Sequence, residues 1–129
     1  MIRVMIIDDS LLARKAIETV LEEDPEISIV GSAPNGKVAL PLIGEHKPQV
    51  VTCDLEMPEM DGVHTLMEIR KRFPQVKVII LSSIAQPNSP KEKLCRNLGA
   101  YAVLAKPMEN SNIRLAEQKV ELLAKNKGS

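Results

Sequence analysis

Short apolar runs alternate with longer segments of helical period along this chain of 129 residues, and this alternation limits the possible folds more than any other feature. Strand and helix units in succession are typical of a parallel sheet with helices packed against it. We expect strands at Arg3 to Ile7, Ile27 to Gly31, Val50 to Cys53, Val76 to Leu81 and Tyr101 to Ala105. The second and fifth are less apolar, which suits sheet edges. The pattern predicts an α/β, doubly wound, five-stranded parallel sheet of order 2-1-3-4-5, with helices on both faces.

Helices are expected between and after these strands, over about Ser10 to Asp24, Asn35 to Glu45, Gly62 to Arg72, Pro90 to Leu98 and Ser111 to Lys125. Ser10 can cap the first helix, and Leu12 and Ala16 recur at helical spacing with the apolar residues that follow. Pro41 removes a backbone donor and should kink or shorten the second helix. Gly99 can take the left-handed conformation that closes the fourth.

Charge and composition exclude several classes of function. Lys plus Arg and Asp plus Glu each number 17, so no basic field exists to attract nucleic acid or an anionic membrane. One Tyr, one Phe and no Trp leave few platforms for stacking bases. Cys53 and Cys95 fall within predicted elements, as core residues in a reducing cytoplasm do. We expect one cytoplasmic domain over residues 1–127, with 128–129 a linker stub or remnant, and no membrane or nucleic-acid partner.

Charged residues follow three of the predicted strands. Asp8 and Asp9 come after the first apolar run, Asp54 after the third and Lys106 after the fifth. The carboxyl ends of parallel strands meet at one edge of a sheet, so we expect these side chains to converge there, with Asp54 exposed. Close carboxylates repel one another and need a cation, and hard oxygen ligands suit Mg²⁺. Helix capping by Asp8 and Asp9 is an equally good reading of that pair taken alone.

Asp54 lies too far before the next helix, near Gly62, to cap it, so its position needs another explanation. An aspartate can act as a nucleophile and become an aspartyl phosphate, provided that charge on the phosphoryl oxygens is neutralised. Mg²⁺ and Lys106 would supply that neutralisation, and the hydroxyl of Ser82 could hydrogen-bond a phosphoryl oxygen. A serine after a strand is common in turns, so Ser82 taken alone is better explained as a structural residue. His46 and His64 have no carboxylate partner evident in sequence, and we expect both at the surface.

Several motifs in order closely resemble the receiver domain of two-component response regulators. They are Asp8-Asp9-Ser10, the stretch from Asp54 to Gly62 (DLEMPEMDG), Ser82-Ser83, Leu98-Gly99-Ala100 and Ala105-Lys106-Pro107. The resemblance implies a flavodoxin-like fold and a phosphoryl group received from a sensor histidine kinase on Asp54. It also implies a Mg²⁺ site made by Asp8, Asp9, Asp54 and the backbone carbonyl of Glu56. Ser82 matches the family's switch hydroxyl, and Lys106 its phosphoryl-pairing lysine.

The family's response implies a switch at the face formed by the fourth helix, fifth strand and fifth helix, read by a downstream effector domain or protein. Glu56 and Ser82-Ser83 look like the regulatory domain of the chemotaxis protein-glutamate methylesterase. Many receivers carry an aromatic residue at the position of Val103, whereas here the aromatic is Tyr101, expected on the same side of the strand. Self-phosphorylation and self-dephosphorylation would be the only chemistry of the chain. The alternatives are a domain cut from a larger effector, a small aspartyl-nucleophile phosphohydrolase, or an unphosphorylated interaction module.

Overall fold

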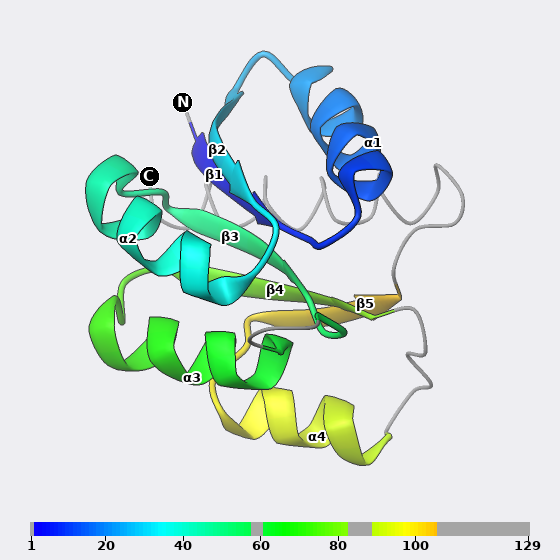
Figure 1. The fold of residues 1–129 in the computed structure, drawn as a ribbon, viewed down its shortest axis with the longest axis vertical. Coiled ribbons are helices and arrows are strands. Elements are labelled where there is room, and N and C mark those ends of the chain that lie inside the picture. Colours follow the sequence, from blue (N-terminus) through cyan, green and yellow to red (C-terminus); the bar gives the residue numbers. More distant parts are fainter. Residues whose placement is uncertain (1, 58–60, 83–88, 106–129) are drawn as a thin grey trace.

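The computed structural model describes residues 2–57, 61–82 and 89–105, in which parallel strands form one sheet of order β2-β1-β3-β4-β5 (Figure 1). The predicted fold class and strand order are confirmed. The strands are β1 (Ile2–Ile7), β2 (Ile27–Ala33), β3 (Val50–Asp54), β4 (Lys77–Ser82) and β5 (Ala102–Ala105). The helices are α1 (Leu11–Glu22), α2 (Gly36–His46), α3 (Gly62–Arg72) and α4 (Pro90–Asn97). Lys106, the predicted helix from Ser111 and residues 128–129 lie outside the described residues.

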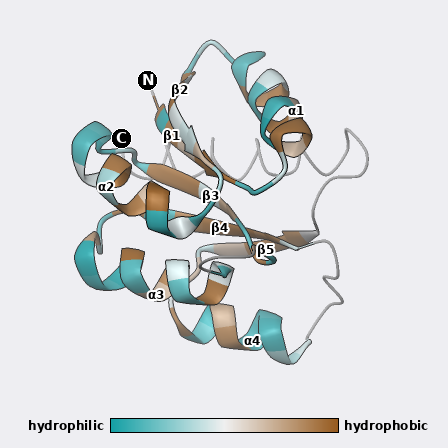
Figure 2. Ribbon diagram, viewed as in Figure 1, coloured by the Kyte–Doolittle hydropathy of each residue, from teal (hydrophilic) through white to brown (hydrophobic). Residues whose placement is uncertain are grey.

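The sheet is covered on both faces by apolar side chains. Leu40 of α2 and Leu66 of α3 belong to a buried cluster that includes Cys53 and Cys95, both free thiols. Ile17 and Leu21 of α1 belong to a second cluster on the opposite face. Figure 1 shows α1 on one side of the sheet and α2, α3 and α4 on the other, and Figure 2 shows the apolar strands between them. The two cysteines are therefore core residues, as predicted.

Helix α1 begins as predicted but buries a narrower stripe than expected. The Ser10 hydroxyl oxygen accepts a hydrogen bond from the Ala13 backbone N–H at 3.2 Å, which caps the helix. Leu12, however, is 84% exposed and Ala16 is also exposed, so not all the apolar residues that recur at helical spacing face the sheet. At about 100° per residue, Leu12 lies about 140° around the helix from Ile17, which does face the sheet.

Helix α2 has the length that the sequence predicts, although it contains Pro41. It runs from Gly36 to His46 without ending at the proline, so of the two effects expected of Pro41, a kink or a shortened helix, the shortening does not occur. Burial of Leu40 and Ile43 against the sheet offsets the lost backbone bond and steric conflict, which cost about 3 kcal/mol inside a helix. Lys47, with φ of 52°, closes the helix in the left-handed conformation.

The end of α4 and the start of β5 differ in how well the sequence predicts them. Gly99 has φ of +101° and follows α4, as predicted. Strand β5 begins at Ala102, so Tyr101 precedes it and is 38% exposed, whereas Val103 is only 7% exposed. Tyr101 therefore lies outside the strand, so the strand alternation from which its side chain was placed on the side of Val103 does not extend to it. In the described part of the chain, every helix is too short or too polar to cross a membrane.

Candidate phosphoacceptor and metal site

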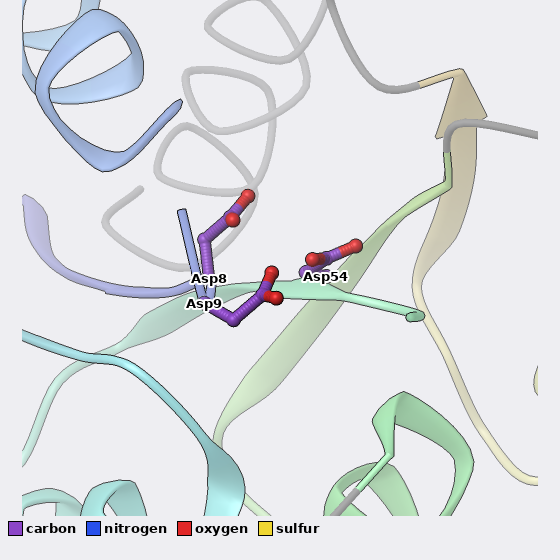
Figure 3. Close-up of side chains that lie close together, drawn as sticks. All are labelled: Asp8, Asp9 and Asp54. Atoms are coloured by element: carbon purple, nitrogen blue, oxygen red, sulfur yellow. The ribbon is translucent and has the colours of Figure 1, made fainter. Parts of the chain in front are cut away.

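Strands β1 and β3 bring three aspartates together. The strands are adjacent and parallel, with Ile7 in register with Cys53, so Asp8 and Asp54 each follow a residue of the same pair. One carboxylate oxygen of Asp8, one of Asp9 and one of Asp54 all lie within 4.8 Å of one another. Figure 3 shows the three carboxyl groups gathered at this edge of the sheet. The structure thus brings together the three acids that the sequence places after two strands.

Burial differs sharply among these acids. Asp8 and Asp54 are each 1% exposed, while Asp9 is exposed. The expectation that Asp54 stands exposed beyond its strand is wrong, because Asp54 is the last residue of β3, which lies between β1 and β4. The Leu55 N–H donates to the Leu81 carbonyl of β4 at 2.8 Å, so bonding between the two strands continues past Asp54. A buried carboxylate pair is costly to form unless a cation or hydrogen bonds compensate it.

Helix capping does not account for the cluster. Ser10 caps α1 and neither aspartate does, although an Asp8 carboxylate oxygen accepts a hydrogen bond from the Ser10 N–H at 2.9 Å. Asp61 caps α3, with its carboxylate accepting from the His64 N–H at 2.9 Å. Asp54 therefore caps neither of these helices. Two carboxylates at 4.8 Å repel each other by about 3.5 kcal/mol at an effective dielectric of about 20, so Asp8 and Asp54 oppose folding unless they are compensated.

The cluster has the donor chemistry and spacing that fit a small divalent cation. Ligand oxygens at about 2.0–2.1 Å from an octahedral Mg²⁺ lie roughly 3.0 to 4.2 Å from one another. Oxygens already within 4.8 Å need only small side-chain rotations to reach that spacing. Asp8, Asp9 and Asp54 could therefore hold Mg²⁺ without movement of the strands that carry them.

Ser82 and Glu56 form the other side of the site. Ser82 is the last residue of β4 and is 3% exposed, one position beyond Leu81, which is in register with Asp54. Its hydroxyl donates a hydrogen bond to the Glu56 carboxylate oxygen Oε1 at 2.9 Å. The Glu56 backbone N–H in turn donates to Asp54 Oδ1 at 3.2 Å. Glu56 thus contacts both the predicted phosphoacceptor and the predicted switch hydroxyl.

Gly62 permits a close approach between the start of α3 and the end of β3. A Cβ atom at this position would lie 2.6 Å from the Asp54 carbonyl oxygen and 2.5 Å from the Leu55 Cα. Both are backbone atoms, which cannot move aside as a flexible side chain can. The Gly62 N–H donates to the Leu55 carbonyl at 2.9 Å, which fixes the chain after Asp54 against α3. A glycine is therefore needed here for steric reasons.

Two contacts at the site were not predicted from the sequence. The Arg14 guanidinium donates a hydrogen bond to the Asp8 backbone carbonyl. The sequence feature that could have indicated this contact is that Arg14 follows Asp8 by six residues. The Glu56 side chain bonds Ser82 across 26 residues, and no local pattern indicates such a contact. Lys106 lies outside the described residues, so its predicted place at the site stays a prediction.

Cys53 and His64 lie near the acidic cluster, but neither is a better candidate than Asp54 for the phosphoacceptor. Burial, and then the charge of Asp54, raise the pKa of the Cys53 thiol, which therefore stays protonated and is a poor nucleophile. His64 is exposed as predicted, but its ring Nδ1 lies 3.1 Å from Asp61 Oδ1, so the expectation that it has no carboxylate partner is wrong. His46 is exposed, also as predicted.

Comparison with known proteins agrees with this geometry. Residues 4–118 match the family described as the response regulator receiver domain. The protein-glutamate methylesterase/protein-glutamine glutaminase 2 of Koribacter versatilis is 42% identical over 124 residues, covering 96% of this chain and 34% of that protein. The chain thus spans about a third of the length of the curated relatives that it matches.

Solved structures give the same result. The response regulator domain of Thermotoga maritima CheB superposes with a TM-score of 0.82 at 31% identity, covering 97% of this chain and 92% of that one. CheY from Borrelia burgdorferi, solved in a complex with CheX, BeF₃ and Mg²⁺, gives 0.83 at 26% identity, covering 95% and 88%. The match over residues 4–118, together with the sheet order and the acidic cluster, shows that the chain belongs to the response regulator receiver domain family.

Proposed function

We propose that this chain accepts a phosphoryl group on Asp54 from a sensor histidine kinase. The observation that carries the proposal is the convergence of Asp8, Asp9 and Asp54 within 4.8 Å at the carboxyl edge of the sheet. Membership of the receiver family, whose match spans residues 4–118 and so includes these residues, supports the same role. The proposed metal ligands are these three aspartates and the backbone carbonyl of Glu56.

The transfer is a displacement at phosphorus. A carboxylate oxygen of Asp54 forms a bond to the phosphorus of a phosphohistidine as the P–N bond breaks, and the bond's electron pair returns to the imidazole nitrogen, which then takes a proton from solvent. Bound Mg²⁺ would neutralise charge on the phosphoryl oxygens. Asp54 is held in place for attack by its position at the end of β3 and by the hydrogen bond from the Glu56 N–H.

Ser82 and Lys106 complete the proposed site. Lys106 would pair with a phosphoryl oxygen, and the Ser82 hydroxyl would donate to another once the group is attached. Because Ser82 ends β4, its movement would be transmitted to the α4 and β5 face and to the fifth helix, and so to an effector. The change is a shift between two states that differ by a few kcal/mol.

The chain's own chemistry would be limited to gaining and losing this phosphoryl group. An external phosphohydrolase of this type usually has an aspartate as general acid two residues after the nucleophile, and Glu56 occupies that position. The Glu56 carboxylate also accepts a hydrogen bond from Ser82, which directs it away from service as an acid. A phosphohydrolase role is therefore disfavoured, and turnover of a phosphomonoester would revive it.

The curated relatives favour a regulatory role within a longer chemotaxis protein. Relatives 36–42% identical to this chain are named as protein-glutamate methylesterase/protein-glutamine glutaminase, and this chain aligns with about a third of each. We propose that the same site regulates such an effector domain in a cytoplasmic chemotaxis pathway. Methylesterase activity that rises when Asp54 is phosphorylated in the full-length context would support this, and activity independent of Asp54 would refute it.

The proposed phosphorylation can be tested with a small-molecule donor. The chain is incubated with acetyl phosphate, with and without Mg²⁺, and its intact mass is measured. We expect a gain of one phosphoryl group that requires Mg²⁺ and is absent in Asp54→Asn. Labelling that is equal in Asp54→Asn would reject Asp54 as the acceptor, and labelling without Mg²⁺ at the same rate would reject the metal site.

A further inference from the structure

The hydrogen bond between Ser82 and Glu56 has no part in phosphoryl transfer as described above. It joins the end of β4 to the segment after β3 across 26 residues, at 2.9 Å from Ser82 Oγ to Glu56 Oε1. Ser82 is only 3% exposed, so its hydroxyl cannot turn freely toward solvent. A buried hydroxyl that leaves one acceptor must find another or incur a desolvation penalty.

Glu56 is placed to compete with the phosphoryl group for this hydroxyl. A serine hydroxyl has one proton to donate, so Ser82 cannot donate to Glu56 and to a phosphoryl oxygen on Asp54 at the same time. Glu56 also bonds Asp54 through its backbone N–H at 3.2 Å, so one residue contacts both groups that phosphorylation must bring together. The acceptor is a carboxylate, and hydrogen bonds to charged groups are stronger than neutral ones.

We propose that the Glu56 side chain is a positioning residue that holds the Ser82 hydroxyl in the unphosphorylated chain and so opposes the switch. The inference rests on the proposed phosphorylation of Asp54 and adds the contact that the phosphoryl group must displace. Removing that contact favours the phosphorylated-like state. A net hydrogen bond of about 1 kcal/mol corresponds to roughly a fivefold change in an equilibrium constant, and a charge-assisted bond to tenfold or more.

The test compares two substitutions that remove the same charge. Glu56→Gln keeps a carbonyl oxygen able to accept from Ser82, whereas Glu56→Ala removes the acceptor. The affinity of each variant for beryllium fluoride, a phosphoryl mimic, is measured at saturating Mg²⁺ by NMR. We expect Glu56→Ala to bind about fivefold more tightly than Glu56→Gln. In a Ser82→Ala background the two should bind equally, because the hydroxyl that distinguishes them is gone.

A measurement without ligand checks the contact itself. Scalar couplings about χ1 of Ser82 should report one rotamer in the wild-type chain and in Glu56→Gln, and rotamer averaging in Glu56→Ala. A single unchanged rotamer in Glu56→Ala would overturn the inference, since Ser82 would then be held by something else.

The outcomes separate this inference from the proposed function. The wild-type chain could bind beryllium fluoride with Mg²⁺ while the ratio of the two Glu56 variants' affinities stays the same with and without the Ser82→Ala change. In that case only the role of Glu56 is lost. If the wild-type chain fails to bind the mimic at all, the proposed phosphorylation fails and the role of Glu56 fails with it.

Discussion

Neutralising Asp8 should stabilise the metal-free chain, although it removes a proposed metal ligand. Asp8 and Asp54 are both 1% exposed, and their nearest cluster oxygens lie within 4.8 Å. Their repulsion is about 3.5 kcal/mol at an effective dielectric of about 20. Asp8→Asn removes it while keeping the Oδ1 atom that accepts from the Ser10 N–H. That bond weakens by about 1 kcal/mol when its acceptor becomes neutral, which leaves a net gain of roughly 2 kcal/mol.

The assay is urea unfolding of the wild-type chain and Asp8→Asn, with and without Mg²⁺. Without the ion we expect the free energy of unfolding of Asp8→Asn to be higher by about 2 kcal/mol. With Mg²⁺ the gap should close, because an ion that binds only the folded wild-type chain raises its stability by about 2.7 kcal/mol at a concentration about 100 times the dissociation constant.

The matched control is Glu26→Gln. Glu26 is exposed and directly precedes β2, so it lies at the amino ends of the parallel strands, whereas the acidic cluster lies at their carboxyl ends. Glu26→Gln therefore removes the same charge far from the cluster. We expect a change within about 0.5 kcal/mol and no dependence on Mg²⁺. The reasoning is refuted if Asp8→Asn is destabilised without Mg²⁺, or if its gain matches that of Glu26→Gln.

Three other substitutions, one of them with a matched control, test packing and capping. Gly62→Ala should lower the free energy of unfolding by about 1–3 kcal/mol, because its Cβ would meet the Asp54 carbonyl oxygen at 2.6 Å. Gly44→Ala, whose Cβ would have its nearest contact at an ordinary 3.6 Å, should be neutral or stabilising, and equal losses in the two variants would refute the steric argument. Thr52 Oγ1 is buried with no hydrogen-bond partner among the described residues, so Thr52→Val should raise the melting temperature, and a fall would reject an unsatisfied hydroxyl. For Asp61, burial acts to raise the carboxyl pKa, but hydrogen bonds at the start of α3 outweigh it and the pKa is lowered from 3.8. A lowered folded pKa gives stability that is present above the unfolded pKa and lost as pH falls through the folded value. Asp61→Ala should therefore cost about 0.5–2 kcal/mol at pH 7 and less below about pH 3.8, and a cost that grows in acid would contradict the capping role.

The alternation of strand and helix segments predicted the sheet order and the central strands correctly. Apolar runs such as Val50 to Cys53 are buried on both faces, and such runs are readable from local sequence. The expectation that Asp8, Asp9 and Asp54 meet at one edge follows from parallel strands alone, and the structure brings these three side chains together. The strand topology alone therefore predicts most of the candidate site.

The features that the sequence did not predict depend on contacts between distant segments. Asp54 is buried at the end of β3, where bonding to the neighbouring strand continues from the Leu55 N–H to the Leu81 carbonyl. The exposure of Leu12 depends on how α1 is rotated against the sheet, which helical spacing alone leaves open. The bond between Glu56 and Ser82 spans 26 residues, and neither residue's neighbours in sequence indicate it.

The central claim is that Asp54 itself receives the phosphoryl group. An aspartyl phosphate can be reduced by borohydride to homoserine, which marks the acceptor permanently and is located by peptide mapping. After treatment with acetyl phosphate and Mg²⁺, we predict homoserine at position 54. Homoserine at position 8 or 9 in place of 54, or at no position in a chain that has gained a phosphoryl mass, would contradict the account.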